Sequence, residues 1–191
     1  MNNCYLDAEA VITFFRITGR KHIFITGSRG SGKSYLVNNM LKHMSDSFNL
    51  LQSHRTDTPQ VVIKSNLVAD NKEFVIGLPR TSGINPASKG NNMTIIEDGF
   101  INCAIPAIDT HLDTTPERLF VIDELGYLES SCIPFQKAVE KLLDNSHVLA
   151  VIRKQSTEFL NRICNRRDVL VIDIDSTFET LSCIIMASGM S

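Results

Sequence analysis

The chain has 191 residues, a formal net charge of −2, a sequence pI near 6.2 and 43% hydrophobic residues. This composition is typical of a globular protein and predicts one domain over residues 1–191. The sequence has no basic arm or acidic tail, which argues against nucleic acid as the main ligand. We expect no membrane span and no secretory signal, and therefore a cytoplasmic protein.

Neither the cysteines nor the basic residues form a pattern that indicates a site. The five cysteines are widely scattered and make no C-x-x-C pair, which argues against a disulfide framework or a zinc site. The one basic cluster, Arg162, Arg166 and Arg167, is followed by Asp168 and is interpreted as a solvated helix end.

The first elements are a helix and a strand. Residues 7–18 carry apolar side chains at helical spacing, so the N-terminal extension over 1–20 is predicted to be helical. The apolar run 22–26 predicts a strand, and a helix is expected over 33–45.

Between this strand and this helix lies the segment 27–34, Gly-Ser-Arg-Gly-Ser-Gly-Lys-Ser, which fits the phosphate-binding pattern G-x-x-x-x-G-K-[ST]. The pattern predicts that Lys33 contacts the β- and γ-phosphates and that Ser34 offers its hydroxyl to Mg²⁺. Arg29 is interpreted as a solvated side chain beside the phosphates. The expected nucleotide-binding residues are Gly27, Ser28, Arg29, Gly30, Ser31, Gly32, Lys33, Ser34 and Tyr35.

The middle of the chain is predicted to be an inserted, β-rich and irregular stretch around 60–117. Short apolar runs at 61–63 and 74–76 predict a hairpin or paired strands. Residues 77–117 are rich in turn-forming residues, with strands expected at 93–96 and near 100–105. A long stretch of this kind could cover the nucleotide.

The segment 118–124, Arg-Leu-Phe-Val-Ile-Asp-Glu, predicts a buried parallel strand that ends in two carboxylates. This is the Walker B pattern. Asp123 is expected to hold Mg²⁺ through the water shell of the metal, opposite Ser34. Glu124 is expected to orient or deprotonate the water that attacks the γ-phosphate.

The rest of the chain alternates helices and strands. A helix is expected around 135–143, strands at 148–152 and 169–172, a helix capped by Ser156, and a last helix that begins with the capping box Ser176-x-x-Glu179. Arg153 and Lys154 follow the strand 148–152. Either is a candidate for contact with the γ-phosphate, with Arg162 a weaker one, and an exposed basic pair is an equally good interpretation.

These elements predict an α/β fold of the P-loop NTPase class: a mostly parallel sheet flanked by helices in a RecA-like three-layer arrangement. Ligands of such sheets bind outside the carboxyl ends of the strands. The phosphate-binding loop, Asp123, Glu124, Arg153 and Lys154 all fall at such ends.

The loop 27–34 together with 121–129, Val-Ile-Asp-Glu-Leu-Gly-Tyr-Leu-Glu, resembles the THEP1-type nucleoside-triphosphatases. That family pairs such a loop with an I-D-E-[LIV]-G-x-[ML]-E segment, and Glu129 matches its last position. The resemblance implies Mg²⁺-dependent hydrolysis of the γ-phosphate of ATP, GTP and other nucleoside triphosphates. It also implies that Lys33, Ser34, Asp123 and Glu124 take the roles given above.

Two other functions fit the phosphate-binding loop. One is a nucleotide or small-molecule kinase, although a kinase does not need a water-directing carboxylate beside Asp123. The other is a nucleotide-gated switch that binds a protein partner, whose identity the sequence does not reveal.

Overall fold

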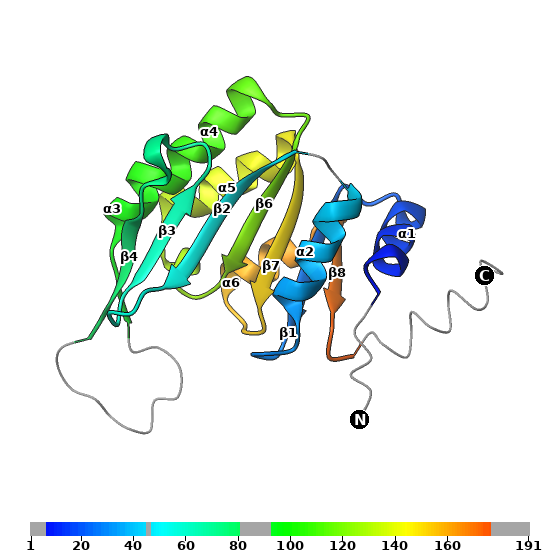
Figure 1. Cartoon of the computed structure of the whole chain (residues 1–191), viewed down its shortest axis with the longest axis horizontal. Coiled ribbons are helices and arrows are strands. Elements are labelled where there is room, and N and C mark those ends of the chain that lie inside the picture. The colour runs from blue at the N-terminus through cyan, green and yellow to red at the C-terminus, as the bar shows by residue number, and fades with distance from the viewer. Residues whose placement is uncertain (1–6, 45–46, 81–92, 177–191) are drawn as a thin grey trace.

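The computed structural model describes residues 7–44, 47–80 and 93–176. Within these residues the chain builds an eight-stranded sheet in the order β5-β4-β3-β2-β6-β7-β1-β8 (Figure 1). The strands β2, β6, β7, β1 and β8 run parallel to one another, whereas β3, β4 and β5 are antiparallel. The predicted α/β fold with a mostly parallel sheet is therefore confirmed.

The parallel half contains the strands that carry the motifs. Its members are β1 (His22–Gly27), β2 (Phe48–Arg55), β6 (Leu119–Leu125), β7 (His147–Arg153) and β8 (Val169–Asp173). Four of these agree with prediction, and β2 was not foreseen. Because β1 lies between β7 and β8, and β6 lies between β2 and β7, the two motif strands are separated only by β7.

The antiparallel half extends the sheet beyond β2. It consists of β3 (Val61–Ser65), β4 (Phe74–Pro79) and β5 (Met93–Ile95). A short 3₁₀ turn, Ala69–Asn71, lies between β3 and β4, which pair antiparallel as the predicted hairpin requires. The strand predicted at 93–96 is confirmed as β5.

Helices cover both faces of the sheet because the strand side chains alternate. Ile23 and Ile25 of β1 pack with α1 (Ala8–Thr18) and α2 (Lys33–Met44), while Phe24 between them packs toward the other face. That second face is covered by α4 (Ile105–Thr114), α5 (Ile133–Asn145) and α6 (Glu158–Cys164). Figure 1 shows the two helical layers on either side of the strands.

The strand predicted near 100–105 is wrong. The segment from Glu97 to Thr114 is helical throughout: α3 (Glu97–Gly99), a π-helical turn (Phe100–Ala104) and α4 follow one another. Pro106 has no N–H to donate and crowds the carbonyl four residues earlier, and a widened π turn before it relieves this conflict. A short buried apolar run cannot be assigned to strand or helix by its spacing alone.

Two predicted helix caps have different outcomes. Thr157, not Ser156, caps α6, since its hydroxyl accepts a hydrogen bond from the N–H of Leu160 at 3.1 Å. The capping box that begins at Ser176 predicts a helix over residues that lie outside the described part of the chain.

The predicted helix over 7–18 is confirmed as α1, capped by Asp7. In the described residues, no helix is both long and apolar enough to span a bilayer.

Candidate nucleotide-binding site

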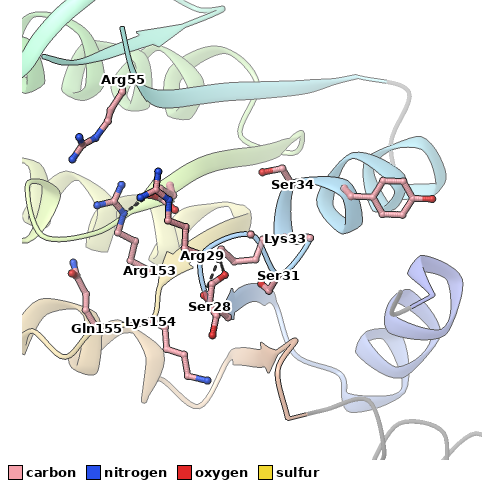
Figure 2. A pocket seen from close by; sticks show the side chains of 14 residues that line it. Ser28, Arg29, Ser31, Lys33, Ser34, Arg55, Arg153, Lys154 and Gln155 are labelled. Carbon is pink, nitrogen blue, oxygen red and sulfur yellow. Dashed lines mark hydrogen bonds and ion pairs between the residues drawn. The ribbon is translucent and has the colours of Figure 1, made fainter. Parts of the chain in front are cut away.

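An open pocket of about 790 Å³ lies at the carboxyl ends of β1, β2, β6 and β7. Figure 2 shows the side chains that enter it. It is lined by Gly27, Ser28, Arg29, Gly30, Ser31, Gly32, Lys33, Ser34, Tyr35, Arg55, Glu124, Arg153, Lys154 and Gln155. All nine predicted nucleotide-binding residues are among them. Asp123 is not in the lining.

The backbone of the phosphate-binding loop depends on glycine. Gly30 and Gly32 have φ of 78° and 91°, values that side-chain-bearing residues rarely adopt. A Cβ on Gly27 would lie 2.8 Å from Ser31 Oγ. The loop passes directly into α2, whose first-turn N–H groups have no partners within the helix. The resulting cluster of donors at a helix N-terminus suits an anion.

The amine of Lys33 is folded over this loop. Its Nζ donates to the carbonyl oxygens of Gly27 at 2.8 Å and Ser28 at 2.7 Å. Both acceptors are carbonyl oxygens without a formal charge, so these hydrogen bonds do not neutralise the amine. The charge therefore remains available to a phosphate that enters the pocket.

A second anchor of the loop comes from the residues after β8. The carboxylate of Asp175 accepts hydrogen bonds from Ser28 N at 2.8 Å and Ser28 Oγ at 2.7 Å. Lys154 bridges the same carboxylate, at 3.0 Å, and that of Asp173, at 2.8 Å. The hydrogen bonds from Ser28 and then that from Lys154 lower the pKa of Asp175 to about 2. Lys154 is therefore paired with two carboxylates, and its charge is largely compensated.

Asp123 lies at the end of β6, in register with Gln52 of β2, whose amide donates to it at 3.5 Å. Burial raises the pKa of this carboxyl, while the nearby Lys33 lowers it. The two residues are thus within electrostatic reach of each other although 90 positions separate them in sequence.

Glu124 forms an ion pair with Arg153, whose Nε donates to Glu124 Oε1. Both side chains line the pocket, and the side chain of Arg153 lies across the backbone of Gly126. A Cβ on Gly126 would lie 2.8 Å from Arg153 Cδ. The glycine of the Asp-Glu-Leu-Gly segment therefore leaves room for Arg153 to reach Glu124.

Glu129, for which the sequence suggested no chemistry, is only 5% exposed and holds the chain after β6. Its Oε2 accepts a hydrogen bond from Gly126 N at 2.9 Å, and its Oε1 accepts one from Ser53 Oγ at 3.3 Å. The Ser53 hydroxyl also lies 3.4 Å from the carbonyl oxygen of Glu124. Burial raises the pKa of Glu129. These contacts link the end of β2 to the last residues of β6, Glu124 among them, and to the turn that follows.

Arg162 lies outside the pocket. It pairs with Glu140 at 2.6 Å and contacts Gln136 of α5 at 3.3 Å. The other two basic residues proposed for the γ-phosphate, Arg153 and Lys154, both line the pocket, and the guanidinium of Arg153 lies beside Glu124. Figure 2 shows Lys154 pointing away from Arg153.

Comparison with known proteins places these features in a family. A family model described as NTPase matches residues 22–179, which include both motifs and all the parallel strands. The chain belongs to this NTPase family, in its THEP1-type branch.

Curated relatives of this NTPase have related sequences over most of their length. Nucleoside-triphosphatase THEP1 of Thermotoga sp. strain RQ2 is 26% identical over 155 residues, which is 80% of this chain and 86% of the relative. The protein of the same name from Thermotoga maritima is 24% identical over 154 residues, with the same coverage.

Solved structures share the fold. THEP1 from Aquifex aeolicus superposes with a TM-score of 0.62 at 17% identity, covering 87% of this chain and 98% of its own. A human cancer-related nucleoside triphosphatase gives a TM-score of 0.59 at 19% identity, covering 90% and 98%.

The donor set of this NTPase fits Mg²⁺. Ser34 and Asp123 offer hard oxygen ligands near the loop, which is the chemistry that Mg²⁺ selects. In the described residues, no three His, Cys, Asp or Glu side chains converge as a metal cage. Mg²⁺ in phosphate sites typically takes one or two protein ligands and completes its shell with phosphates and water, so the two groups suffice.

Proposed function

We propose that the chain hydrolyses the γ-phosphate of nucleoside triphosphates, ATP and GTP among them, to a diphosphate and orthophosphate in the presence of Mg²⁺. One observation carries the proposal: Lys33 and Glu124, far apart in sequence, line the same pocket beside Asp123. The family and its curated relatives, which are named nucleoside-triphosphatases, support hydrolysis in general.

In this mechanism the loop binds the polyphosphate through backbone N–H groups, and Lys33 exchanges its two carbonyl partners for phosphate oxygens. A phosphate that draws the guanidinium of Arg153 toward itself also frees Glu124. The released carboxylate then accepts a hydrogen bond from the attacking water and orients it in line with the bond to be broken. Arg153 stabilises the charge that develops on the phosphoryl oxygens.

Ser34 and Asp123 would hold Mg²⁺, which would neutralise part of the negative charge of the bound polyphosphate. The burial that raises the pKa of Asp123 leaves its carboxylate poorly solvated, so a nearby cation would favour its ionised form.

The direct test measures orthophosphate release from several triphosphates with and without Mg²⁺. We expect release by the wild type, none above background by Lys33→Ala, and slow release with retained nucleotide binding by Glu124→Gln. Arg118→Ala, which removes an exposed arginine just before the start of β6, is the matched surface control and should match the wild type. Absence of Mg²⁺-dependent release from every triphosphate would overturn the proposal.

Two further assays distinguish hydrolysis from the two alternatives, which the named relatives do not favour. A kinase would transfer labelled phosphate to an acceptor instead of water. A switch would capture a partner only with a non-hydrolysable triphosphate.

A further inference from the structure

Arg55, the last residue of β2, enters the pocket from a strand that the sequence motifs do not include. Its side chain is exposed, and within the described part of the chain it makes no hydrogen bond or ion pair. Figure 2 shows it lying on the same side of the pocket as Arg153. It is thus a cation in the pocket that pairs with no carboxylate among residues 7–44, 47–80 and 93–176.

The backbone that carries Arg55 is held in place by contacts on both sides. β2 pairs in parallel with β6 as far as Gln52 and Asp123, and antiparallel with β3 through the pair Arg55 and Val61. Ser53, two residues before Arg55, bonds to Glu129 and to the carbonyl of Glu124. The position of Arg55 relative to Glu124 is therefore defined by the sheet.

Arg55 shares its surroundings with Glu124 and Arg153 in a second, smaller cavity. This space of about 40 Å³ lies beside the main pocket and is lined in part by Ser53, Arg55, Glu124, Glu129 and Arg153. No residue of the phosphate-binding loop borders it. Arg55 therefore belongs to the Glu124 end of the pocket.

That end is where the terminal phosphate must lie, because a carboxylate that orients the attacking water has to face the γ-phosphorus. Two of the other cations there are already paired with carboxylates. Arg153 is paired with Glu124, and Lys154 with Asp173 and Asp175. Arg29 also enters the pocket, but from the loop itself. The guanidinium of Arg55, which enters from β2, offers planar, paired donors that match phosphate oxygens.

We propose that Arg55 is a further catalytic residue, which binds the terminal phosphate from the β2 side of the pocket. This inference rests on the proposed function, since it requires a nucleoside triphosphate in the pocket. It adds a property that the loop alone does not provide: Arg55 contacts a triphosphate but finds no partner on a diphosphate. The residue therefore helps the site to distinguish substrate from product.

The test measures the dissociation constants of ADP and of a non-hydrolysable ATP analogue, with Mg²⁺, by calorimetry. Arg55→Ala should weaken binding of the analogue by roughly tenfold or more, as expected for loss of a charge-assisted hydrogen bond. Its affinity for ADP should stay within about twofold, since no contact is lost. Arg55→Lys, which keeps the charge but not the paired donors, should recover part of the loss.

Arg118→Ala removes the same charge at the opposite end of the sheet and should change neither constant. Equal weakening of the analogue and ADP by Arg55→Ala would overturn the proposal. It would indicate that the positive charge of Arg55 attracts any nucleotide and makes no specific contact with the terminal phosphate. The proposal would also be overturned if Arg55→Ala bound both the analogue and ADP as tightly as the wild type. Orthophosphate release by the wild type is measured separately. If the wild type binds nucleotides but releases no phosphate, hydrolysis fails while the binding comparison still decides the role of Arg55. A wild type that binds neither nucleotide overturns both proposals.

Discussion

Substitution of Glu129 tests how the turn after β6, which follows Glu124 directly, is held in place. This side chain is almost fully buried and accepts one hydrogen bond from Gly126 N and one from Ser53 Oγ. Glu129→Ala removes both acceptors at once. Glu129→Gln keeps an oxygen for Gly126 N–H and offers an amide to the Ser53 hydroxyl. The pair of variants therefore separates the hydrogen bonds from the charge.

The expected magnitude follows from these two contacts. A buried N–H left without a partner costs roughly 1–3 kcal/mol, and the bond from Ser53 contributes about 1 kcal/mol more. Removal of the buried carboxylate offsets part of this, because burial penalises the charged form and raises its pKa. We expect Glu129→Ala to lower the free energy of unfolding by about 2 kcal/mol, or roughly 4–8 °C in Tm for a chain of this size. Glu129→Gln should cost less than about 1 kcal/mol.

The contribution of Glu129 to the free energy of unfolding depends on pH in a defined direction. Since the folded-state pKa of Glu129 lies above its ordinary value of 4.5, the group contributes its full stability below that value. This contribution is lost as the pH rises through the folded-state pKa. Glu129→Gln has no such titration, so its stability relative to the wild type should improve as the pH rises.

The assays are urea unfolding across this pH range and steady-state kinetics of phosphate release. Glu129 lies outside the main pocket, so Glu129→Ala should lower kcat with little change in nucleotide affinity, whereas Glu129→Gln should retain most activity. Glu117→Ala, at an exposed position, serves as control. Wild-type kcat in Glu129→Ala, or equal destabilisation by Gln and Ala, would refute the reasoning.

Three further predictions concern the backbone and a buried histidine. Gly126→Ala places a Cβ 2.8 Å from Arg153 Cδ and should displace Arg153 from Glu124. We expect a reduced kcat with an unchanged melting temperature. A kcat equal to that of the wild type would contradict this prediction. Gly99→Ala places a Cβ 2.3 Å from the backbone oxygen of Val75 and should cost about 3 kcal/mol by thermal unfolding. Gly19→Ala, with φ 65° and no neighbour within 4 Å, should cost only about 1 kcal/mol, and the reverse order would argue against the packing at Gly99. Burial lowers the pKa of His22 from 6.5 to about 4, so the fold should lose stability as the pH falls from 6.5 toward 4. His22→Gln should flatten this dependence in urea titrations, and an unchanged slope would show that other groups cause it.

Several elements were predictable from sequence because their signals are local. The phosphate-binding loop needs specific residues at fixed spacing, and the buried strands β1, β6, β7 and β8 are continuous apolar runs. The sequence patterns do not predict β2, because its second half, Gln-Ser-His-Arg, is polar and neither alternates nor forms an apolar run. Its polar side chains are explained only by the groups they meet across the sheet.

The sequence pattern does not predict the helical segment 97–114, because the contacts that make it helical are distant in sequence. An apolar segment interrupted by Pro106 reads as a strand and a turn, and burial of Phe100, Ala104 and Ile108 in one core makes it a helix. Packing against β3, β4 and α5 decided this.

The amino-acid sequence by itself determined the phosphate-binding loop, the carboxylates near the end of β6 and the parallel strands that hold them, because each depends on neighbours along the chain. Only the tertiary structure decided which basic residue forms an ion pair with Glu124 and which one pairs with other carboxylates. Arg153 and Lys154 are adjacent and chemically alike, but Asp173 and Asp175 of the β8 end take Lys154 and leave Arg153 to Glu124. Ion pairs form between residues that the fold brings together, and no spacing in the sequence encodes them.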